Sequence, residues 1–491
     1  MSNNVFPDPM NVNISSPNPL PVDTGAATTA FGEMSVAQLT PLIQITAQHG
    51  IRGNVIEANL GGTTTEVDSN FVISTGTGAS NVAALVSTAQ AQYRAGQGLL
   101  CRYSCIMGTP QANNTQLSGF LNSACGFGFG YNGLDFGIVY GRGGALEYQE
   151  LTITVGASSS ENATITIDGT AYTVLLTNSS IEQNAYEIAE SLSSQVPGYA
   201  FTSIGPNVEC LAKLPDLGGG AFAFSSATAI AAFVQIEAGI LPAETWINKA
   251  DWNVNPDISI NPQLGNVYQV KLQSLGYGGI SFYIENPETS RLELVHIFKY
   301  ANTSTVPLVK NPTFRVGWAV RNSGNTTDVS LRGASASAFI EGEMGFAGDN
   351  TGLGIVQPAI TTALTNLLTI RCTSVFNNSA NRNSIILSSI SMTTESTKVS
   401  YVRLIKNPTV TSGFLSYEKA SDLGEVAINQ TGIDINSGKT IGVFSITNGE
   451  VTTAALDIAN PLNPGDVLCF AGQMSSGASN DMSVTIGWQD F

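Results

Sequence analysis

Two runs of alternating residues constrain what this chain can fold into more than any other feature. Residues 126–140 read GFGFGYNGLDFGIVY, and residues 277–298 read YGGISFYIENPETSRLELVHIF. Both runs alternate apolar or aromatic residues with small or polar ones, which is the period of a strand with one buried face. The stretch between them has a different character and a helix pattern of its own. We therefore expect one β-sandwich interrupted by an inserted domain, without an enzyme-like α/β core.

The composition narrows the class of protein further. The chain has 491 residues, of which only 12% are charged, and Gly alone accounts for 50. A surface of hydroxyls and amides is typical of a protein that works in an assembly, and an acidic secreted β-protein fits equally well. The net charge of −17 disfavours nucleic acid and anionic membrane surfaces as partners. We recognise neither a secretory signal nor an apolar stretch that is long enough to span a bilayer.

Cysteine and histidine do not form a metal-ligand pattern. The six cysteines are Cys101, Cys105, Cys125, Cys210, Cys372 and Cys469. We interpret them as small buried residues, and a disulfide from Cys125 to Cys101 or Cys105 stays open. The two histidines, His49 and His296, are too few for a Cys/His zinc site. No DxDxDG run is present to hold calcium. We therefore expect neither a metal nor a cofactor.

The predicted fold class is mainly β, with two β-sandwich domains of jelly-roll or lectin-like type and a small α+β module inserted in the first. Changes in pattern along the chain place the parts as follows: an extended N-terminal docking arm over 1–35, a discontinuous concanavalin-like sandwich over 36–150 and 243–342, the module over 151–242, a linker over 343–364, and a C-terminal sandwich over 365–491.

Local signals are strongest in the module. Asp168-Gly169 lies between two alternating runs and predicts a two-residue hairpin turn. Apolar residues from Ile181 to Leu192 recur at helical spacing, with Ser179 or Ser180 as the N-cap and Pro197-Gly198 as the stop. In the first sandwich, residues 80–93 (SNVAALVSTAQAQY) predict a short helix.

Several segments resemble structural proteins of tailed phages and other large double-stranded DNA viruses. The segments that carry the resemblance are Ala30–Gln44, Gly96–Thr109, Gly265–Pro287, Leu367–Arg371, Leu404–Thr409 and Asn463–Leu468. The alternating runs are similar to the concanavalin- or laminin-G-like sandwich of fibre-like appendage proteins in those viruses. The resemblance implies a virion structural protein and brings no functional residue with it.

No catalytic constellation is recognisable in the sequence. Neither His49 nor His296 accompanies a GxSxG or HExxH motif. Glycoside hydrolysis needs two carboxylates across a groove. The nearest local pairs, Glu147 with Glu150 and Glu341 with Glu343, lie at strand or domain edges and are interpreted as solvated. We therefore expect that the protein is not an enzyme.

Aromatic residues on the alternating strands are the remaining candidates for a site. Tyr131, Phe136, Tyr277 and Tyr283 are predicted to contact a glycan or a neighbouring subunit. A ring exposed on a concave sheet can stack on a sugar. Burial in the core or in a homotypic interface is the favoured alternative.

Two functions from different classes follow from these observations. The favoured one is a virion structural protein, a homo-oligomeric fibre, appendage or surface-decoration component, expected as a homotrimer in the virion. Its arm over 1–35 would bind other virion proteins such as capsid, portal or tail. The alternative is a lectin-like receptor module that binds a host-surface glycan, and a glycan-degrading spike is a third reading.

Overall fold

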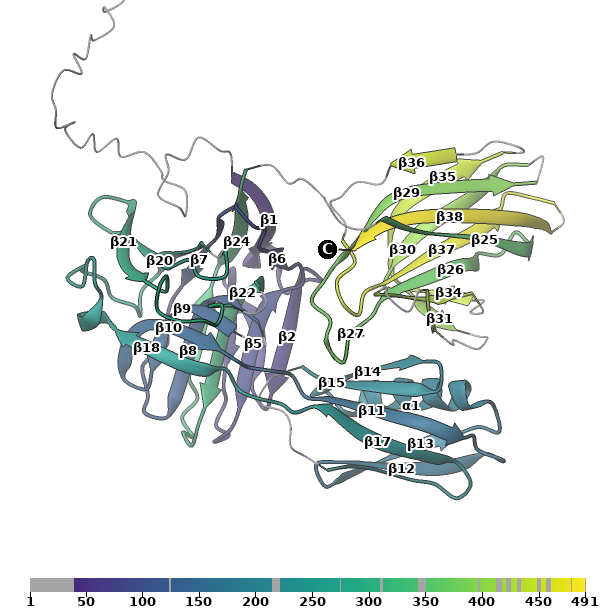
Figure 1. Cartoon of the computed structure of the whole chain (residues 1–491), viewed down its shortest axis with the longest axis horizontal. Helices are drawn as coiled ribbons and strands as arrows, with labels where there is room; N and C mark the ends of the chain where they lie inside the picture. The colour runs from purple at the N-terminus through teal and green to yellow at the C-terminus, as the bar shows by residue number, and fades with distance from the viewer. Residues whose placement is uncertain are drawn as a thin grey trace, which may run out of the picture.

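The computed structural model describes residues 39–490 apart from short stretches at 123–124, 214–220, 274, 310–311, 343–349, 396–397, 412–416, 421–424, 431–433, 448–451, 456–460 and 478. Within this part the protein is mainly β, as predicted, with antiparallel sheets and one α-helix. Figure 1 shows two β-rich bodies and a smaller body that contains the helix. The arm expected over 1–35 lies outside the described residues.

Two sheets form the first sandwich. The six-stranded sheet runs in the order β1 (Leu39–Thr46), β24 (Ser335–Glu341), β7 (Leu99–Cys105), β19 (Asn266–Leu272), β20 (Ile280–Asn286) and β21 (Arg291–Phe298). The eight-stranded sheet runs in the order β18 (Ala243–Asn248), β10 (Asp135–Arg142), β9 (Cys125–Asn132), β8 (Asn114–Leu121), β22 (Thr313–Asn322), β5 (Val82–Ser87) and β2 (Val55–Leu60), with β6 (Ala91–Gln92) beside β22.

A third, small sheet and two short 3-10 helices complete this sandwich. The sheet contains β23 (Ser330–Gly333), β4 (Asn70–Ser74) and β3 (Thr63–Val67), and the helices are η1 (Ala47–His49) and η2 (Lys249–Asp251).

Aromatic side chains fill the space between the two large sheets. The ring of Phe129, on β9, lies 4.8 Å from that of Tyr268 on β19 and 5.7 Å from that of Phe282 on β20 (centroid distances). Trp252 meets the same phenylalanine edge-on at 5.9 Å. Rings in these tilted and edge-to-face arrangements add to the free energy gained by burying their apolar area. One contiguous core therefore joins the sheets.

The prediction of a helix over residues 80–93 is wrong. The chain forms β5 and β6 there, and β5 pairs with β2 on one side and β22 on the other. Ala83 and Leu85 are fully buried in the core. Alanine and leucine favour helices in isolation, but here pairing with two neighbouring strands outweighs this preference.

The inserted module consists of two sheets and the helix. Its four-stranded sheet contains β14 (Tyr199–Ile204), β15 (Asn207–Ala212), β11 (Tyr148–Val155) and β17 (Ile230–Glu237), and its three-stranded sheet contains β13 (Thr170–Leu176), β12 (Glu161–Ile167) and β16 (Phe222–Ser225). The hairpin turn and the helix form where the sequence predicts them. Asp168 and Gly169 have φ values of 51° and 79°, and α1 (Ile181–Gln195) is capped by Ser180, whose side chain accepts a hydrogen bond from the Gln183 amide.

A two-stranded ribbon connects the module to the first sandwich. β10 pairs with β18 as far as Arg142 and Ala243, and Ala145 bridges Ile240 through two backbone hydrogen bonds of 2.8 and 3.0 Å. The same two chain segments then pair as β11 and β17 from Tyr148 onward. β11 thus begins three residues before the predicted start of the module at 151.

The C-terminal sandwich also has two principal sheets. One contains β25 (Asn350–Ile360), β38 (Asn480–Asp490), β29 (Ile385–Thr394) and β36 (Thr452–Ala455). The other contains β31 (Thr409–Thr411), β34 (Asp434–Asn436), β26 (Thr365–Cys372), β37 (Val467–Met474), β30 (Ser400–Lys406) and β35 (Lys439–Ile446), with β33 (Val426–Asn429) and β32 (Glu418–Lys419) attached; β27 (Val375–Phe376) and β28 (Ser379–Ala380) form a separate hairpin.

The linker predicted over 343–364 is wrong over residues 350–360. These residues form β25, which pairs with β38 along most of its length. Gly352 and Gly354 lie opposite Gly487 and Thr485 in this strand, which is at the edge of the sheet, where pairing to one neighbour is enough to hold it.

Candidate functional site

The outer face of the eight-stranded sheet in the first sandwich carries glycines on its central strands. Along β9, Phe127 and Phe129 point into the core, so Gly128 and Gly130 form the outer face. The register places Gly119 of β8 beside Gly128, and Gly137 of β10 beside Gly130.

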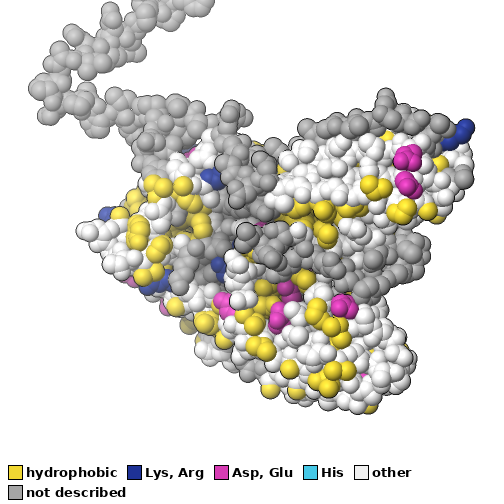
Figure 2. All heavy atoms as spheres, turned by 45° about the vertical axis from the view of Figure 1, so that its right-hand side comes forward, with side chains coloured by type: hydrophobic (Ala, Val, Ile, Leu, Met, Phe, Trp, Pro, Cys, Tyr) yellow, Lys and Arg dark blue, Asp and Glu magenta, His cyan; other side chains and the backbone are white. Residues whose placement is uncertain are grey.

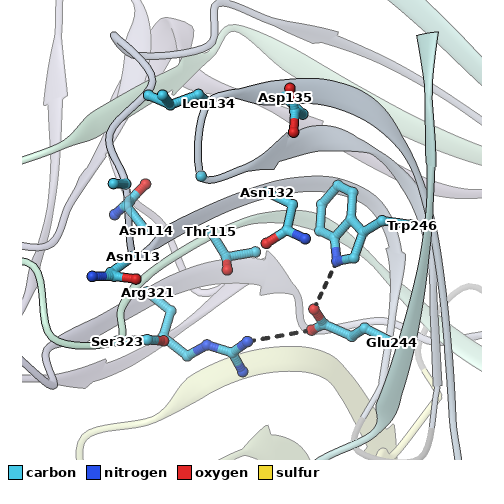
Figure 3. Close-up of a pocket in the computed structure, with 12 residues that line it drawn as sticks. Asn113, Asn114, Thr115, Asn132, Leu134, Asp135, Glu244, Trp246, Arg321 and Ser323 are labelled. Carbon is cyan, nitrogen blue, oxygen red and sulfur yellow. Dashed lines mark hydrogen bonds and ion pairs between the residues drawn. The ribbon is translucent and has the colours of Figure 1, made fainter. Parts of the chain in front are cut away.

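A cavity of about 580 Å³ lies on this outer face, at the end of the sheet that carries the β9–β10 turn (Figure 3). Its volume is within the range of about 300–1,000 Å³ that is usual for small-molecule sites. Polar side chains from five strands and their loops line it, and one tryptophan does so too. Figure 3 shows these side chains arranged around an open centre.

The first wall of the cavity comes from β18. Glu244 and Trp246 are two residues apart and therefore lie on the same face of the strand. Trp246 Nε1 donates a hydrogen bond to Glu244 Oε2 at 3.0 Å. This bond uses the polar edge of the indole and fixes the ring, which is half-buried. The apolar face of the ring is the part that a ligand can contact.

Arg321, at the end of β22, forms the opposite wall. Its Nη2 lies 3.6 Å from Glu244 Oε1, although three strands separate β22 from β18. In a flat sheet, four strand spacings amount to roughly 19 Å. The two side chains can therefore meet only because the sheet is not flat.

The Arg321 guanidinium is incompletely satisfied within the described residues. Its ion pair with Glu244 is longer than the about 2.7–2.9 Å of a strong charge-assisted hydrogen bond. Its Nε is buried and has no hydrogen-bond partner there. Buried polar groups normally have partners, so the unfilled bonding capacity of Arg321 is a signal that points to a ligand.

The rim of the cavity is the β9–β10 turn together with the loop before β8. Asn132 and Asp135 flank Gly133, whose φ of 64° suits glycine in a tight hairpin turn. The Gly133 amide donates to the Asn114 carbonyl at 2.8 Å and ties the turn to the loop. Asn114 is 2% exposed, and its Nδ2 donates to Asn322 Oδ1 at 2.8 Å. A hydrogen-bonded frame thus holds the rim.

Two of the four predicted site residues lie in the core. Tyr131 and Phe136 are 7% and 9% exposed, and their rings pack edge-on at 5.4 Å. Neither presents a ring face to solvent, so the prediction that they contact a glycan is wrong. The alternation was interpreted correctly, but Tyr131 shares the face of Phe127 and Phe129, and that face points to the six-stranded sheet.

The other two predicted residues lie away from the cavity and apart from each other. Tyr277 is 40% exposed on a loop, and its hydroxyl donates to the Thr305 carbonyl at 3.0 Å. Tyr283, on β20, is half-buried, and the Lys271 ammonium lies 5.6 Å from its ring centroid. Burial raises the pKa of Tyr283. The structure brings neither of them to the pocket.

Sequence reasoning missed Trp246, Glu244 and Arg321. One signal was present in AETWIN (243–248), where Glu, Trp and Asn alternate with smaller or apolar residues in a chain with only 4 tryptophans. That pattern predicts a strand with an exposed tryptophan. The meeting with Arg321, 75 residues later in the chain, depends on sheet order, which no local pattern reveals.

The remaining chemically interesting residues have structural partners. Tyr199 Oη donates to the buried Glu147 Oε2 at 2.6 Å, and Gln149 Nε2 donates to its Oε1 at 2.9 Å. The Asn253 amide donates to His296 Nδ1 at 3.2 Å, and burial lowers the pKa of this imidazole. Lys271 Nζ lies 3.8 Å from Glu341 Oε1. Glu147 and Glu341 are 0% and 6% exposed, so the interpretation of these two carboxylates as solvated is wrong, and the contacts make them parts of the fold.

Five of the cysteines are buried free thiols, as interpreted from the sequence. Cys101 and Cys105 are among them, so neither forms the disulfide with Cys125 that was left open. Burial raises the pKa of the Cys105 thiol to about 12. The described residues contain no cluster of three or more His, Cys, Asp or Glu side chains that could bind a metal. In the same part, no helix has the length and apolar character needed to cross a membrane.

Comparisons with known proteins give distant likenesses only. No protein-family model matches the sequence, and neither does any curated protein. Among solved structures, the carbohydrate recognition domain of Emp47p matches with 7% identity and a TM-score of 0.26, over 62% of this chain and 98% of that one.

Two further structures show likenesses of the same order. A lectin from Bauhinia forficata in complex with GalNAc matches with 9% identity and a TM-score of 0.23, over 61% of this chain and 98% of the lectin. The binding domain of botulinum neurotoxin serotype D/C matches with 8% identity and a TM-score of 0.26, over 92% and 98%. TM-scores this low carry no argument about function, and the expected viral resemblance stays a prediction.

Proposed function

We propose that the first sandwich binds carbohydrate in the cavity lined by Trp246. The observation that carries the proposal is the indole held by Glu244 across the cavity from Arg321 and the Asn132–Asp135 turn. A sugar ring has an apolar C–H face that stacks on an aromatic ring, and hydroxyls that bond to amides and carboxylates. The cavity offers both kinds of contact within one space of sugar size.

The test is glycan binding by the full chain with and without the indole. Trp246→Ala removes the stacking surface, and we expect it to weaken binding at least tenfold on a glycan array and in titration with the glycans that score. Tyr277→Ala is the matched control, because it removes an exposed ring outside the cavity. Thermal unfolding of both variants checks that they fold.

Two results would overturn the proposal. One is silence of the wild-type protein across a broad array. The other is a Trp246→Ala variant that folds and binds as tightly as the wild type. Loss of binding in Tyr277→Ala instead would move the site to the loop that carries Tyr277.

We also propose, as a compatible second role, that the chain is a homo-oligomeric structural component of a virion. The observation in favour is an exposed aliphatic stripe on β17, where Ile230, Val234 and Ile236 are 59%, 54% and 37% exposed. Figure 2 shows charged side chains only sparsely on the visible face. Exposed apolar patches and weakly charged surfaces are suited to burial between subunits.

Two experiments test this second role. Val234→Glu should reduce the oligomer mass measured by light scattering, with Val356→Glu, at another exposed valine, as the control. Deletion of residues 1–33 should leave folded domains that no longer enter particles. A monomeric wild-type chain, or normal incorporation of the truncated chain, would exclude the role in this form.

A further inference from the structure

We infer that the Trp246 pocket selects a neutral sugar ring over an acidic one. This inference rests on the proposed carbohydrate binding and adds the chemical class of the ligand. It follows from the charges around the cavity and from the spacing between Arg321 and Glu244.

The side chains that line the cavity carry a net negative charge. Among the described lining residues, the ionised side chains are Asp135, Glu244 and Arg321, so two carboxylates face one guanidinium. The guanidinium is already paired with Glu244. A carboxylate on the ligand would therefore meet a site in which two carboxylates outnumber one guanidinium, in a chain whose net charge is −17. Like charges within a few ångströms of each other repel strongly in a partly desolvated site.

The gap between Arg321 and Glu244 suits a hydroxyl group. The two facing atoms are 3.6 Å apart, which is too long for a direct hydrogen bond. A hydroxyl both donates and accepts. Placed beside the pair, it donates to Glu244 Oε1 and accepts from the guanidinium, so both charged groups gain a hydrogen bond. A ligand carboxylate can only accept, so it would offer no hydrogen bond to Glu244 Oε1.

The tryptophan restricts how the ring can lie. Trp246 Nε1 is already bonded to Glu244 Oε2, so the indole offers only its apolar face. A pyranose on that face directs its hydroxyls sideways, toward Asp135 and Asn132 on the rim and toward Arg321 on the opposite wall (Figure 3). Each of these groups can form a hydrogen bond with a hydroxyl of a neutral polyol.

The experiment uses matched pairs of methyl glycosides that differ only at carbon 6: glucoside with glucuronide, galactoside with galacturonide, and mannoside with mannuronide. Isothermal titration of the full chain should show that the neutral member of the binding pair binds at least tenfold more tightly. Glu244→Gln removes one carboxylate, and this variant should reduce the ratio of the acidic member's dissociation constant to that of the neutral member. Arg321→Gln should weaken binding of the neutral member and increase the same ratio.

The outcomes separate this inference from the proposed function. If the acidic member of a pair binds as tightly as the neutral one or more tightly, selectivity for neutral sugars is overturned while carbohydrate binding stands. If no glycoside binds and the array is silent, both fail. An unchanged ratio in a folded Glu244→Gln variant would overturn the role of the carboxylate in selectivity.

Discussion

The two faces of the eight-stranded sheet are made from alternate residues of the same strands, yet they are built in opposite ways. The inner face is crowded with rings: Phe120, Phe127, Phe129, Tyr140 and Trp318 are each at most 4% exposed. The outer face carries glycine at the matching positions of four strands, namely Gly119, Gly128, Gly130, Gly137 and Gly317. One face holds the sandwich together through its rings, and the other lets neighbouring strands approach closely at their glycines.

The outer-face glycines are required by the close approach of two strands. A Cβ built on Gly128 would lie 1.9 Å from the Ser118 carbonyl oxygen, and one on Gly130 would lie 1.8 Å from that of Gln116. These distances are far inside van der Waals contact, so the close approach of β8 and β9 requires glycine at both positions. Glycine on the outer face is therefore a condition for forming the sheet.

The largest effect is expected from adding a single methyl group to the outer face. In Gly128→Ala the new Cβ meets backbone that has no space to move, so we expect a loss of more than about 4 kcal/mol in the free energy of unfolding, or no soluble protein. Gly53→Ala is the control, because a Cβ there meets nothing within 4 Å. Equal urea midpoints for the two variants would show that the sheet tolerates a Cβ at Gly128 and does not require glycine there.

The next effect tests the inner face. Phe129→Ala removes a ring that contacts Tyr268, Phe282, Trp252 and Phe136. Removal of a buried phenylalanine costs about 3–5 kcal/mol, and urea unfolding should show this. Leu117→Ala, a half-buried position on the outer face, should cost about 1 kcal/mol. A larger loss for Leu117 than for Phe129 would reverse the comparison.

A pH titration of stability tests a buried residue of the facing six-stranded sheet. His296 is 5% exposed and lies opposite Phe282 on β20, and burial lowers its pKa. The folded protein therefore binds this proton more weakly than the unfolded chain does. Stability is complete above the ordinary imidazole pKa of about 6.5 and falls as the pH drops below it, by at most about 1.4 kcal/mol per pH unit.

The variant that checks this is His296→Gln. Its free energy of unfolding should lose less than that of the wild type between pH 7 and pH 5, when both are measured by urea unfolding. Identical pH dependence in the two proteins would mean that His296 does not contribute.

The smallest effect on stability is expected from the outer-face ion pair. Glu244→Gln should change the free energy of unfolding by no more than about 0.5 kcal/mol, because both partners are partly exposed and the pair is long. The same substitution is expected to change sugar selectivity. A loss above about 2 kcal/mol would assign Glu244 to the fold rather than to the site.

Local sequence patterns predicted local structure well where a single mechanism decides it. The turn at Asp168-Gly169 needs positive φ at two successive residues, which aspartate and glycine tolerate. The helix over Ile181–Gln195 has its cap and its buried stripe in the sequence. The prediction of a helix over residues 80–93 failed because pairing with two distant strands decided the conformation there. The prediction of a linker failed because β38, at the end of the chain, pairs with residues 350–360.

The candidate site was predictable only in part. An alternating strand with an outward tryptophan can be recognised in residues 243–248. Its value as a site depends on Arg321 and on the Asn132–Asp135 turn. These lie on other strands of the same sheet, and those strands are far from β18 along the chain. Tyr131 was selected instead because alternation alone does not say which face of a strand is covered.

The sequence by itself determined that this chain is mainly β and which residues share a strand face, because side-chain direction alternates along any strand. The run GFGFGYN already separates rings from glycines. Only the tertiary structure decided that the rings point inward against the six-stranded sheet and that the glycines lie on the outer face. Curvature and strand order arise from packing between distant segments, and they bring Arg321 within reach of Glu244.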